Sequence, residues 1–452
     1  MTETTRRTLL KTGLAGGAGA LAGPVLWTQP GWSAVAPSGI HLSYGLTPRS
    51  AMNVSWSTPR SVRKPVLDLG TTTRYGRTVG ADSVSSLGVD TVYHHVGLHD
   101  LRPGTTYHYR LRHAGGTVRA GTFRTPPRGQ RAFRFAAFGD MGVNTAAAKH
   151  VALLNRQKPA FAFVVGDLCY ADSGGMGTSS RSQQDFGVWD TWLRQIQPSA
   201  RAIPWMTTVG NHEMENGNGE LGYAGYFARF RNPRNGVKGG RATYSFVHGN
   251  VAFVALDGND ATYEYTRNNG YLGSALDHWL DSRLRYLRGR DDVDFIVVGF
   301  HQCAYCTNMA HASDGGVRDR WEAIFDKHQV DLVVNGHNHC YERTHLMRDG
   351  SPVQEAPKGG TVTTNKGTVY VTAGGAGASA YPEVGLPTSY VTVRGGLKVP
   401  EITTWNAVAS AEHSIAFLDV TPPNKWGTAT MKLRTLSTSG AVLDTLTMRR
   451  TS

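Results

Sequence analysis

Five short polar blocks in this sequence have the residue types and the spacing of metal ligands. Each block directly follows an apolar run, and a glycine stands in or next to most of them. The blocks are Gly139-Asp140, Gly166-Asp167-x-x-Tyr170, Gly210-Asn211-His212-Glu213, His301 and Gly336-His337-x-His339. A single Gly-Asp pair is usually only a turn. Five such blocks in succession indicate one site that draws its ligands from five places in the chain.

The donors in these blocks are too many for one metal ion. Without His212 and Glu213, for which other roles are expected, they comprise two Asp, one Tyr, one Asn and three His side chains, whereas a tetrahedral zinc ion takes four ligands. The set suits two ions that share a bridging carboxylate, and its mixture of hard and borderline donors favours two different ions. Two neighbouring ions can polarise a phosphoryl oxygen and lower the pKa of a bound water, which is the chemistry of phosphoester hydrolysis.

The apolar runs in front of the blocks are the elements that must position them. Strands are expected at Phe133–Phe138, Phe161–Val165, Trp205–Val209, Val251–Leu256, Phe295–Phe300, Leu332–Val334 and Val369–Thr372. Helices are expected at Ala146–Asn155, Asp185–Arg194, Ser274–Leu287 and Val317–His328. The alternation predicts a layered α/β domain over residues 132–452, which hairpins within 415–449 close. Ligands bind beyond the carboxyl ends of strands in such sheets, so the five loops can converge.

Residues 38–127 read as a separate, small all-β domain. Ala51–Trp56 alternates apolar and polar positions, with Trp56 facing the core. The Leu-x-Pro-Gly-x-x-Tyr segment from Leu101 to Tyr107 resembles the tyrosine corner of fibronectin type III-like sandwiches. Thr125–Gly129 forms a short linker to the α/β domain.

The first 36 residues have the features of an export signal. Thr5–Lys11 carries a twin-arginine signature, Thr12–Trp27 is apolar, and Ala34–Ala36 offers a cleavage site. A membrane anchor is the alternative interpretation. No later segment reaches the ~20 apolar residues that cross a bilayer. We therefore expect a protein that loads its metals in the cytoplasm, resides outside it, and has no transmembrane segment after cleavage.

The net charge indicates which kinds of partner to expect, and the cysteine content indicates which cross-links are possible. The formal charge of +13 suits anionic substrates or an anionic cell envelope. The chain has no basic run interleaved with aromatic residues, so no nucleic-acid partner is expected.

The four cysteines allow disulfides outside the cytoplasm, and Cys303–Cys306 with Cys169–Cys340 is one of three possible pairings. Buried thiols are the alternative, and a four-cysteine zinc site is less favoured because only one CxxC is present.

The five blocks, together with Cys340-Tyr341-Glu342-Arg343 after the paired histidines, resemble the purple acid phosphatase family of the calcineurin-like metallophosphoesterase superfamily. The preceding fibronectin-like domain matches the large plant-type form of that family. The resemblance covers nearly the whole chain after the leader. It implies a β-sandwich followed by a four-layer α/β domain, in which helices flank two mixed sheets.

The resemblance also implies a role for each ligand. Fe(III) would be held by Asp140, Tyr170 and His339, and a divalent Zn, Mn or Fe ion by Asn211, His301 and His337. Asp167 would bridge the two ions, and a bridging hydroxide would attack phosphorus. A phenolate from Tyr170 suits ferric iron and would colour the protein. The alternative is a core tyrosine over a site without ferric iron.

Two further histidines are candidates for catalysis. His212 follows the proposed ligand Asn211, so it is better placed to bind phosphate and stabilise the transition state than to bind metal. His311 lies ten residues after His301, where the family has a histidine that acts as general acid or phosphate clamp. The family often has two adjacent histidines there, but this chain has Ala310. An ordinary polar loop residue is the alternative for His311.

These features together predict a secreted acid phosphatase that hydrolyses small phosphate monoesters. One alternative is a phosphodiesterase acting on nucleotides, phospholipid headgroups or teichoic acid, because the same metals serve both reactions. The other is a non-catalytic envelope-binding protein, against which the five intact ligand blocks argue. Glu213 and Tyr341–Arg343 are expected to hold the loops rather than to touch substrate.

Overall fold

The computed structural model describes residues 36–85, 89–114, 118–172, 185–215 and 219–451. All of them belong to one compact unit that spans Val35–Ser452. The predicted export signal and its cleavage site lie outside the described residues, except for Ala36. None of the helices in the described ranges has the length and apolar character needed to cross a membrane.

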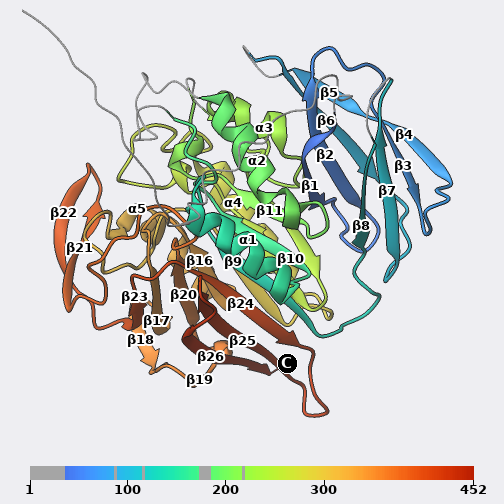
Figure 1. The fold of residues 1–452 in the computed structure, drawn as a ribbon. Coiled ribbons are helices and arrows are strands. Elements are labelled where there is room, and N and C mark those ends of the chain that lie inside the picture. Colours follow the sequence, from blue (N-terminus) through green and yellow to red (C-terminus); the bar gives the residue numbers. More distant parts are fainter. Residues whose placement is uncertain (1–35, 86–88, 115–117, 173–184, 216–218, 452) are drawn as a thin grey trace, which may run out of the picture. The chain divides into compact units, whose positions relative to one another are not determined.

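The N-terminal strands form two four-stranded sheets (Figure 1). The first has the order β1-β2-β6-β5, with β1 Ser38–Tyr44, β2 Met52–Pro59, β5 Asp82–Ser85 and β6 Thr91–Leu98. The second has the order β4-β3-β7-β8, with β3 Val66–Gly70, β4 Arg77–Gly80, β7 Thr106–Arg112 and β8 Arg119–Arg124. Trp56 is 1% exposed, as its alternation predicted. The Tyr107 hydroxyl accepts a hydrogen bond from the Arg102 N–H at 2.8 Å, which is the contact of a tyrosine corner.

The α/β domain contains a seven-stranded sheet of order β11-β10-β9-β24-β25-β26-β19. Its strands are β9 Phe133–Phe138, β10 Phe161–Val165, β11 Trp205–Thr208, β19 Thr361–Thr363, β24 Ser414–Thr421, β25 Thr428–Ser437 and β26 Val442–Thr451. Strands β9, β10 and β11 are parallel, β24 and β25 run antiparallel to both of their neighbours, and β26 is antiparallel to β25 but parallel to β19. The sheet is therefore mixed, and the predicted C-terminal hairpins are part of it.

An eight-stranded sheet has the order β12-β13-β14-β16-β20-β17-β18, and β23 pairs with β17. Its strands are β12 Tyr244–His248, β13 Val251–Ala255, β14 Phe295–Gly299, β16 Leu332–Asn335, β17 Tyr341–Arg348, β18 Ser351–Gln354, β20 Thr368–Ala373 and β23 Asn406–Ser410. Strands β13, β14, β16 and β20 are parallel. A small third sheet joins β15 Ser313–Asp314, β21 Thr388–Val393 and β22 Leu397–Ile402.

Side-chain alternation along the parallel strands explains the layers. One set of side chains, including Phe135, Phe163 and Phe253, packs in a single core between the two sheets, where the rings of Phe135 and Phe253 meet edge to face at 4.9 Å. The opposite set packs against helices. These strands are buried on both faces, which explains why they appear as continuous apolar runs.

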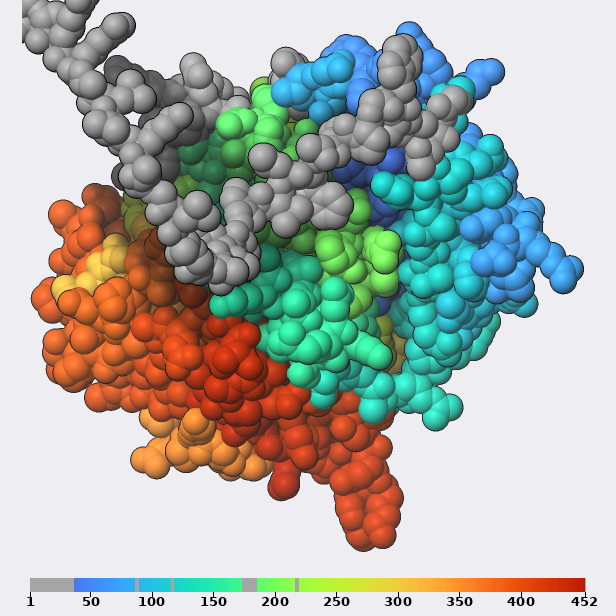
Figure 2. Space-filling view, viewed as in Figure 1, coloured from blue at the N-terminus to red at the C-terminus, as the bar shows by residue number. Residues whose placement is uncertain are grey.

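The helices cover the two outer faces and complete four layers. They are α1 Thr145–Gln157, α2 Phe186–Ala200, α3 Ala224–Arg229, α4 Ser274–Arg288, α5 Gly315–Val317 and α6 Ala323–Lys327. Helices α1 and α2 pack on the seven-stranded sheet, and α4 and α6 pack on the eight-stranded sheet. Figure 2 shows α1 beside the red C-terminal strands of the seven-stranded sheet. The β-sandwich and the four-layer α/β domain are thus as predicted.

The helix predicted over Val317–His328 is present, but it is not a regular α-helix throughout. A π-helical turn at Arg318–Glu322 separates α5 from α6. Within this turn Arg320 reaches Asp260 at 2.8 Å and Asp277 at 2.8 Å. The widened turn is the local adjustment that accompanies these ion pairs. The helix predicted over Asp185–Arg194 is longer than expected, because Ile196 and Ala200 continue its buried face, and Asp185 is its N-cap.

Candidate metal centre and active site

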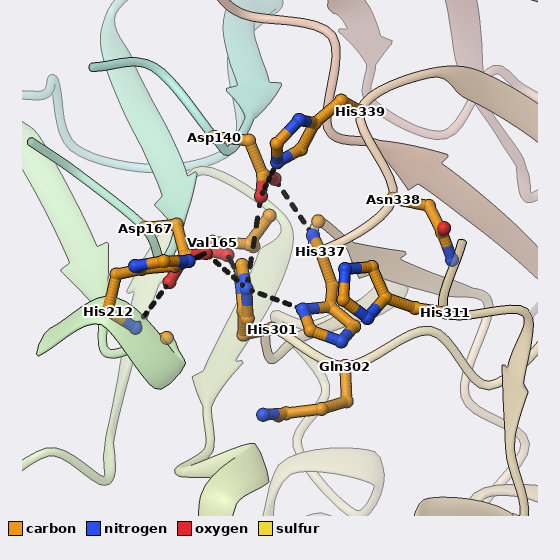
Figure 3. Close-up of polar contacts among 12 residues, drawn as sticks. Asp140, Val165, Asp167, His212, His301, Gln302, His311, His337, Asn338 and His339 are labelled. Carbon is orange, nitrogen blue, oxygen red and sulfur yellow. Dashed lines mark hydrogen bonds and ion pairs between the residues drawn. The ribbon is translucent and has the colours of Figure 1, made fainter. Parts of the chain in front are cut away.

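The predicted ligand blocks meet at one edge of the layered domain. Strands β9, β10 and β11 of one sheet and β14 and β16 of the other each end directly before a block or one residue short of it. Figure 3 shows the side chains from both sheets turned toward a common centre, with His301 and His337 facing each other and His339 beside Asp140. The five strand ends therefore come from two facing sheets rather than from one.

Close backbone packing brings the strand ends together. A Cβ atom on Gly336 would lie 2.4 Å from Asp140 Oδ2, and one on Gly210 would lie 2.1 Å from Asp167 Oδ1. Only glycine leaves room for these carboxylates. The backbone also turns sharply at the predicted ligands themselves, which take left-handed φ values: Asp140 +60°, Asp167 +47°, Tyr170 +56° and His337 +70°.

One group of donors consists of Asp140, Tyr170 and His339. The Tyr170 hydroxyl lies 3.2 Å from Asp140 Oδ1 and 3.0 Å from His339 Nε2. His339 Nδ1 contacts the Ser379 carbonyl at 2.9 Å, which makes Nδ1 the donor and leaves the Nε2 lone pair facing the group. The three predicted ferric ligands are therefore in mutual contact.

The second group is built around His301 and His337. His301 Nδ1 donates to the Val165 carbonyl at 2.8 Å, so Nε2 is free to face Asp167 Oδ2 at 3.1 Å. His337 Nδ1 lies 3.2 Å from the same His301 Nε2. The Asn211 amide oxygen is buried and has no hydrogen-bond partner among the described residues.

Burial and charge make this centre a strong cation site. Burial raises the pKa of Asp140 well above its ordinary value, and the neighbouring Asp167 adds to the shift. Burial also opposes the charge of Asp167, but the facing His301 and His212 outweigh it and lower the pKa of this carboxyl. For His301, the two carboxylates overcome burial and raise the pKa to about 10. Two adjacent buried carboxylates need nearby positive charge, which bound metal ions would supply.

The donor chemistry fits a pair of metal ions. Each of the three histidines gives one ring nitrogen to a fixed oxygen acceptor, which is how proteins orient metal-binding imidazoles. Their other nitrogens face the carboxylates or each other. Burial lowers the pKa of His337 to about 3 and that of His339 to about 4, so these two rings are held neutral, the form that binds metal. The unpartnered Asn211 oxygen is a further available donor.

His212 lies beside the centre and is held by a residue that the sequence did not single out. Its Nδ1 contacts both oxygens of Asp172 at 2.8 and 2.9 Å, and its Nε2 lies 3.7 Å from Asp167 Oδ2. Burial opposes protonation, but Asp167 and Asp172 together raise the pKa of His212 to about 9. Asp172 follows Tyr170 by two positions, so an extended Asp-x-x-Tyr-x-Asp block is the sequence signal that could have identified it.

Glu213 holds the loops, as expected. Its carboxylate accepts hydrogen bonds from the backbone N–H groups of Asp167, Leu168 and Gly210 at 2.7–2.8 Å. It thereby ties the end of β10 to the end of β11. Tyr341 and Arg343 both bond to the buried Asp444, so they anchor β17 behind the centre.

His311 is brought to the centre, and it contacts two residues that the sequence analysis missed. Its ring lies 4.0 Å from that of His337, its Nδ1 contacts Glu264 Oε1 at 2.6 Å, and its Nε2 lies 3.4 Å from the Tyr381 hydroxyl. The alternative of an ordinary surface loop residue is not what the structure shows. Tyr381 also stacks on the His339 ring at 4.3 Å. Neither Glu264 nor Tyr381 stands in a recognisable motif.

The cysteines are all buried and free. Cys303, Cys306 and Cys340 form one cluster behind the centre, and the sulfur atoms of Cys306 and Cys340 are 3.9 Å apart. Cys169 packs in the core beneath α1 and α2. The neighbour of Cys340 is therefore Cys306 rather than Cys169.

The fold and the donor set define a metallophosphoesterase, and comparisons with known proteins agree. Residues 133–341 match the calcineurin-like phosphoesterase family, and residues 37–125 match the purple acid phosphatase N-terminal domain. An uncharacterized protein from Mycobacterium tuberculosis is 31% identical over 98% of this chain and 96% of its own length. The phosphoenolpyruvate phosphatase of Allium cepa is 28% identical over 69% of this chain and 64% of its own length.

A solved structure shows the same fold. The purple acid phosphatase from yellow lupin seeds superposes with a TM-score of 0.69 at 21% identity, covering 92% of this chain and 75% of its own. The chain belongs to the purple acid phosphatase family. It is therefore a metal-dependent phosphatase, and the family implies a binuclear metal centre.

Proposed function

We propose that this protein is an exported acid phosphatase that hydrolyses small phosphate monoesters with a ferric–divalent metal pair. Asp140, Tyr170 and His339 would hold the ferric ion, Asn211, His301 and His337 would hold the divalent ion, and Asp167 would serve both. The observation that carries this proposal is the meeting of these donors at one buried edge, where an Asn211 oxygen has no partner among the described residues.

Such a metal pair, when bound, would polarise the phosphoryl oxygens and supply a water of lowered pKa as nucleophile. The protein's own side chains bind the phosphate group and act on the leaving group. His212 is fixed through Nδ1 by Asp172, so Nε2 is its free donor toward a phosphate oxygen. Its positive charge stabilises the charge that develops on phosphate in the transition state.

His311 acts on the leaving group. Its Nδ1 is occupied by Glu264, so Nε2 is the nitrogen that faces outward, next to the Tyr381 hydroxyl. A groove of about 540 Å³, lined by Thr262–Thr266 and by the turn around Arg394, has Glu264 in its wall. Proton transfer from a positioned histidine typically accelerates such a step by roughly 10²–10⁴-fold.

Metal analysis combined with a visible spectrum tests the ferric assignment. The purified protein should contain one iron and one further ion per chain and should absorb in the visible region through a tyrosinate–iron contact. Tyr170→Phe should remove the colour and leave some metal bound. Tyr381→Phe is the matched control, because Tyr381 stacks on His339 and its hydroxyl contacts His311 rather than a proposed ferric donor, and it should stay coloured. A coloured Tyr170→Phe variant would contradict the assignment.

Substrate comparison tests the monoester preference. Turnover of p-nitrophenyl phosphate should exceed that of bis(p-nitrophenyl) phosphate across the acidic range. A reversed order would favour the phosphodiesterase alternative. If the metal-loaded protein hydrolyses neither ester at any pH, the non-catalytic alternative holds.

Export can be tested separately from catalysis. Replacing Arg6 and Arg7 together by Lys should keep the protein in the cytoplasm with its activity intact, because the change affects only the twin-arginine signature. Cell fractionation with an activity assay measures the outcome. Unchanged export of the double variant would overturn the proposed route.

A further inference from the structure

Glu264 links two histidines that come from different parts of the chain. It lies in the connection between β13 and α4, and its carboxylate stands between His311 and His337. Oε1 contacts His311 Nδ1 at 2.6 Å, and Oε2 contacts His337 Nε2 at 2.8 Å. The side chain of Glu264 is 21% exposed, whereas that of His337 is 2% exposed. One carboxylate therefore reaches from the rim of the site into its buried centre.

These contacts have the geometry of direct hydrogen bonds. The nitrogen–oxygen distances of 2.6 and 2.8 Å match charge-assisted N–H···O bonds. Glu264 therefore contacts both rings directly.

The hydrogen bonds determine which nitrogen each ring presents. Because His337 gives Nε2–H to Glu264, its lone pair is on Nδ1, which faces His301 Nε2 at 3.2 Å. Because His311 gives Nδ1–H to the same carboxylate, Nε2 points away toward the Tyr381 hydroxyl. Orienting partners of this kind set the tautomer of metal-binding histidines and strengthen their binding.

We propose that Glu264 is a positioning residue that fixes the divalent-side ligand His337 and the leaving-group histidine His311 relative to each other. The inference rests on the proposed function, since it assigns a partner to two residues of that site. It means that occupancy of the divalent position and action on the leaving group depend on the same carboxylate. The ferric-side donors Tyr170 and His339 bond to each other, to Asp140 and to the Ser379 carbonyl rather than to Glu264, so they should not depend on it.

Glu264→Gln tests the inference, because the amide keeps the shape but has only one oxygen to accept from two N–H groups. The variant should bind the divalent ion about 10–100-fold more weakly while it keeps its iron and its visible band. With the divalent ion in excess, kcat should fall and KM should change little. The loss should be larger for an alkyl phosphate than for p-nitrophenyl phosphate.

Zinc titration followed by elemental analysis and a visible spectrum gives readouts that are independent of activity. Glu322→Gln is the matched control: Glu322 accepts a hydrogen bond from Tyr305 at 2.5 Å, away from the proposed ligands, and its replacement should change none of these readouts. A crystal structure of Glu264→Gln should show the His311 or His337 ring displaced from its wild-type position.

The outcomes separate this inference from the proposed function. If the wild type holds two ions and hydrolyses phosphate esters, but Glu264→Gln matches it in zinc affinity and kcat, the inference alone is wrong. The inference is also wrong if the variant loses iron and colour together with zinc. If the wild type neither holds two ions nor hydrolyses esters, the proposed function fails and the inference fails with it.

Discussion

The residues that face each other across the centre are held in two different ways. The strand-end residues Asp140, Asp167, His301 and His337 have side chains that are at most 2% exposed. Backbone groups hold them in part: Asp140 accepts from the His337 N–H, and His301 donates to the Val165 carbonyl. Facing sheets therefore fix the strand-end group.

The loop-borne group, His212 and His311, is more open and depends on side chains. These two side chains are 12% and 22% exposed, and their partners are the carboxylates of Asp172 and Glu264. We infer from this difference that the rigid strand ends determine the metal positions, whereas the adjustable loops bind the substrate. Substitutions in the two groups should therefore differ in the size and the kind of their effects.

The largest effect is expected at Asp167. Asp167→Asn keeps the shape but removes the charge that both ions are proposed to share, so kcat should fall by about 10³-fold or more. Assays at saturating substrate, with elemental analysis of both metals, measure the change. Asp281→Asn on α4 removes a half-buried carboxylate that pairs with Arg285 on the same helix, and it should leave kcat unchanged. If Asp167→Asn kept a tenth of the wild-type rate, the strand-end group would not be the essential one.

A smaller loss is expected at His212. His212→Ala should lower kcat by about 10²-fold with both metals retained, because one charged donor to the transition state is lost. Asp172→Asn leaves the ring in place with a weaker partner and should cost about 10-fold. Steady-state kinetics and metal content distinguish the two causes. Loss of a metal from His212→Ala would move this residue into the strand-end group.

His311 should show a loss that depends on the substrate. His311→Ala should reduce kcat by about 10²-fold for an alkyl phosphate and by less than about 10-fold for p-nitrophenyl phosphate, whose leaving group needs little protonation. A series of phenyl phosphates with different leaving-group pKa values measures the slope. An equal loss across the series would contradict a role at the leaving group.

The smallest effect is expected at Tyr381. Its hydroxyl lies 3.4 Å from His311 Nε2, which is a long contact for a hydrogen bond. Tyr381→Phe keeps the stacking on His339 and should change kcat by no more than about threefold. A larger loss would show that this hydroxyl belongs to the catalytic group. Assays with both substrate types would then locate its role.

The sequence predicted the strand-end group better than the loop-borne group, and the reason is physical. A strand that is buried on both faces leaves a continuous apolar run, and the ligand comes directly after it, as with Val165 and Asp167. The position of such a donor in the sequence is then enough to predict that it lies at the end of a strand. The pairing of two facing sheets followed from the family resemblance, and the structure confirms it.

The partners of His311 leave no such local pattern. Glu264 is 47 positions from His311, and Tyr381 is 70 positions from it, so only the folded chain brings them together. The same holds for Cys306 and Cys340, whose neighbourhood depends on how two loops pack. The π-helical turn at Arg318–Glu322 likewise carries Arg320, whose partners Asp260 and Asp277 are distant in sequence.

The left-handed backbone at Asp140, Asp167, Tyr170 and His337 has a consequence for laboratory evolution. Each of these residues has a conformation that costs an L-amino acid roughly 1–2 kcal/mol and that glycine adopts freely. Glycine at these positions would relieve the strain and remove a ligand in the same step. Libraries selected for thermal stability alone should therefore accumulate glycine at these four positions and yield proteins that are more stable but inactive. Selection for turnover must accompany every round.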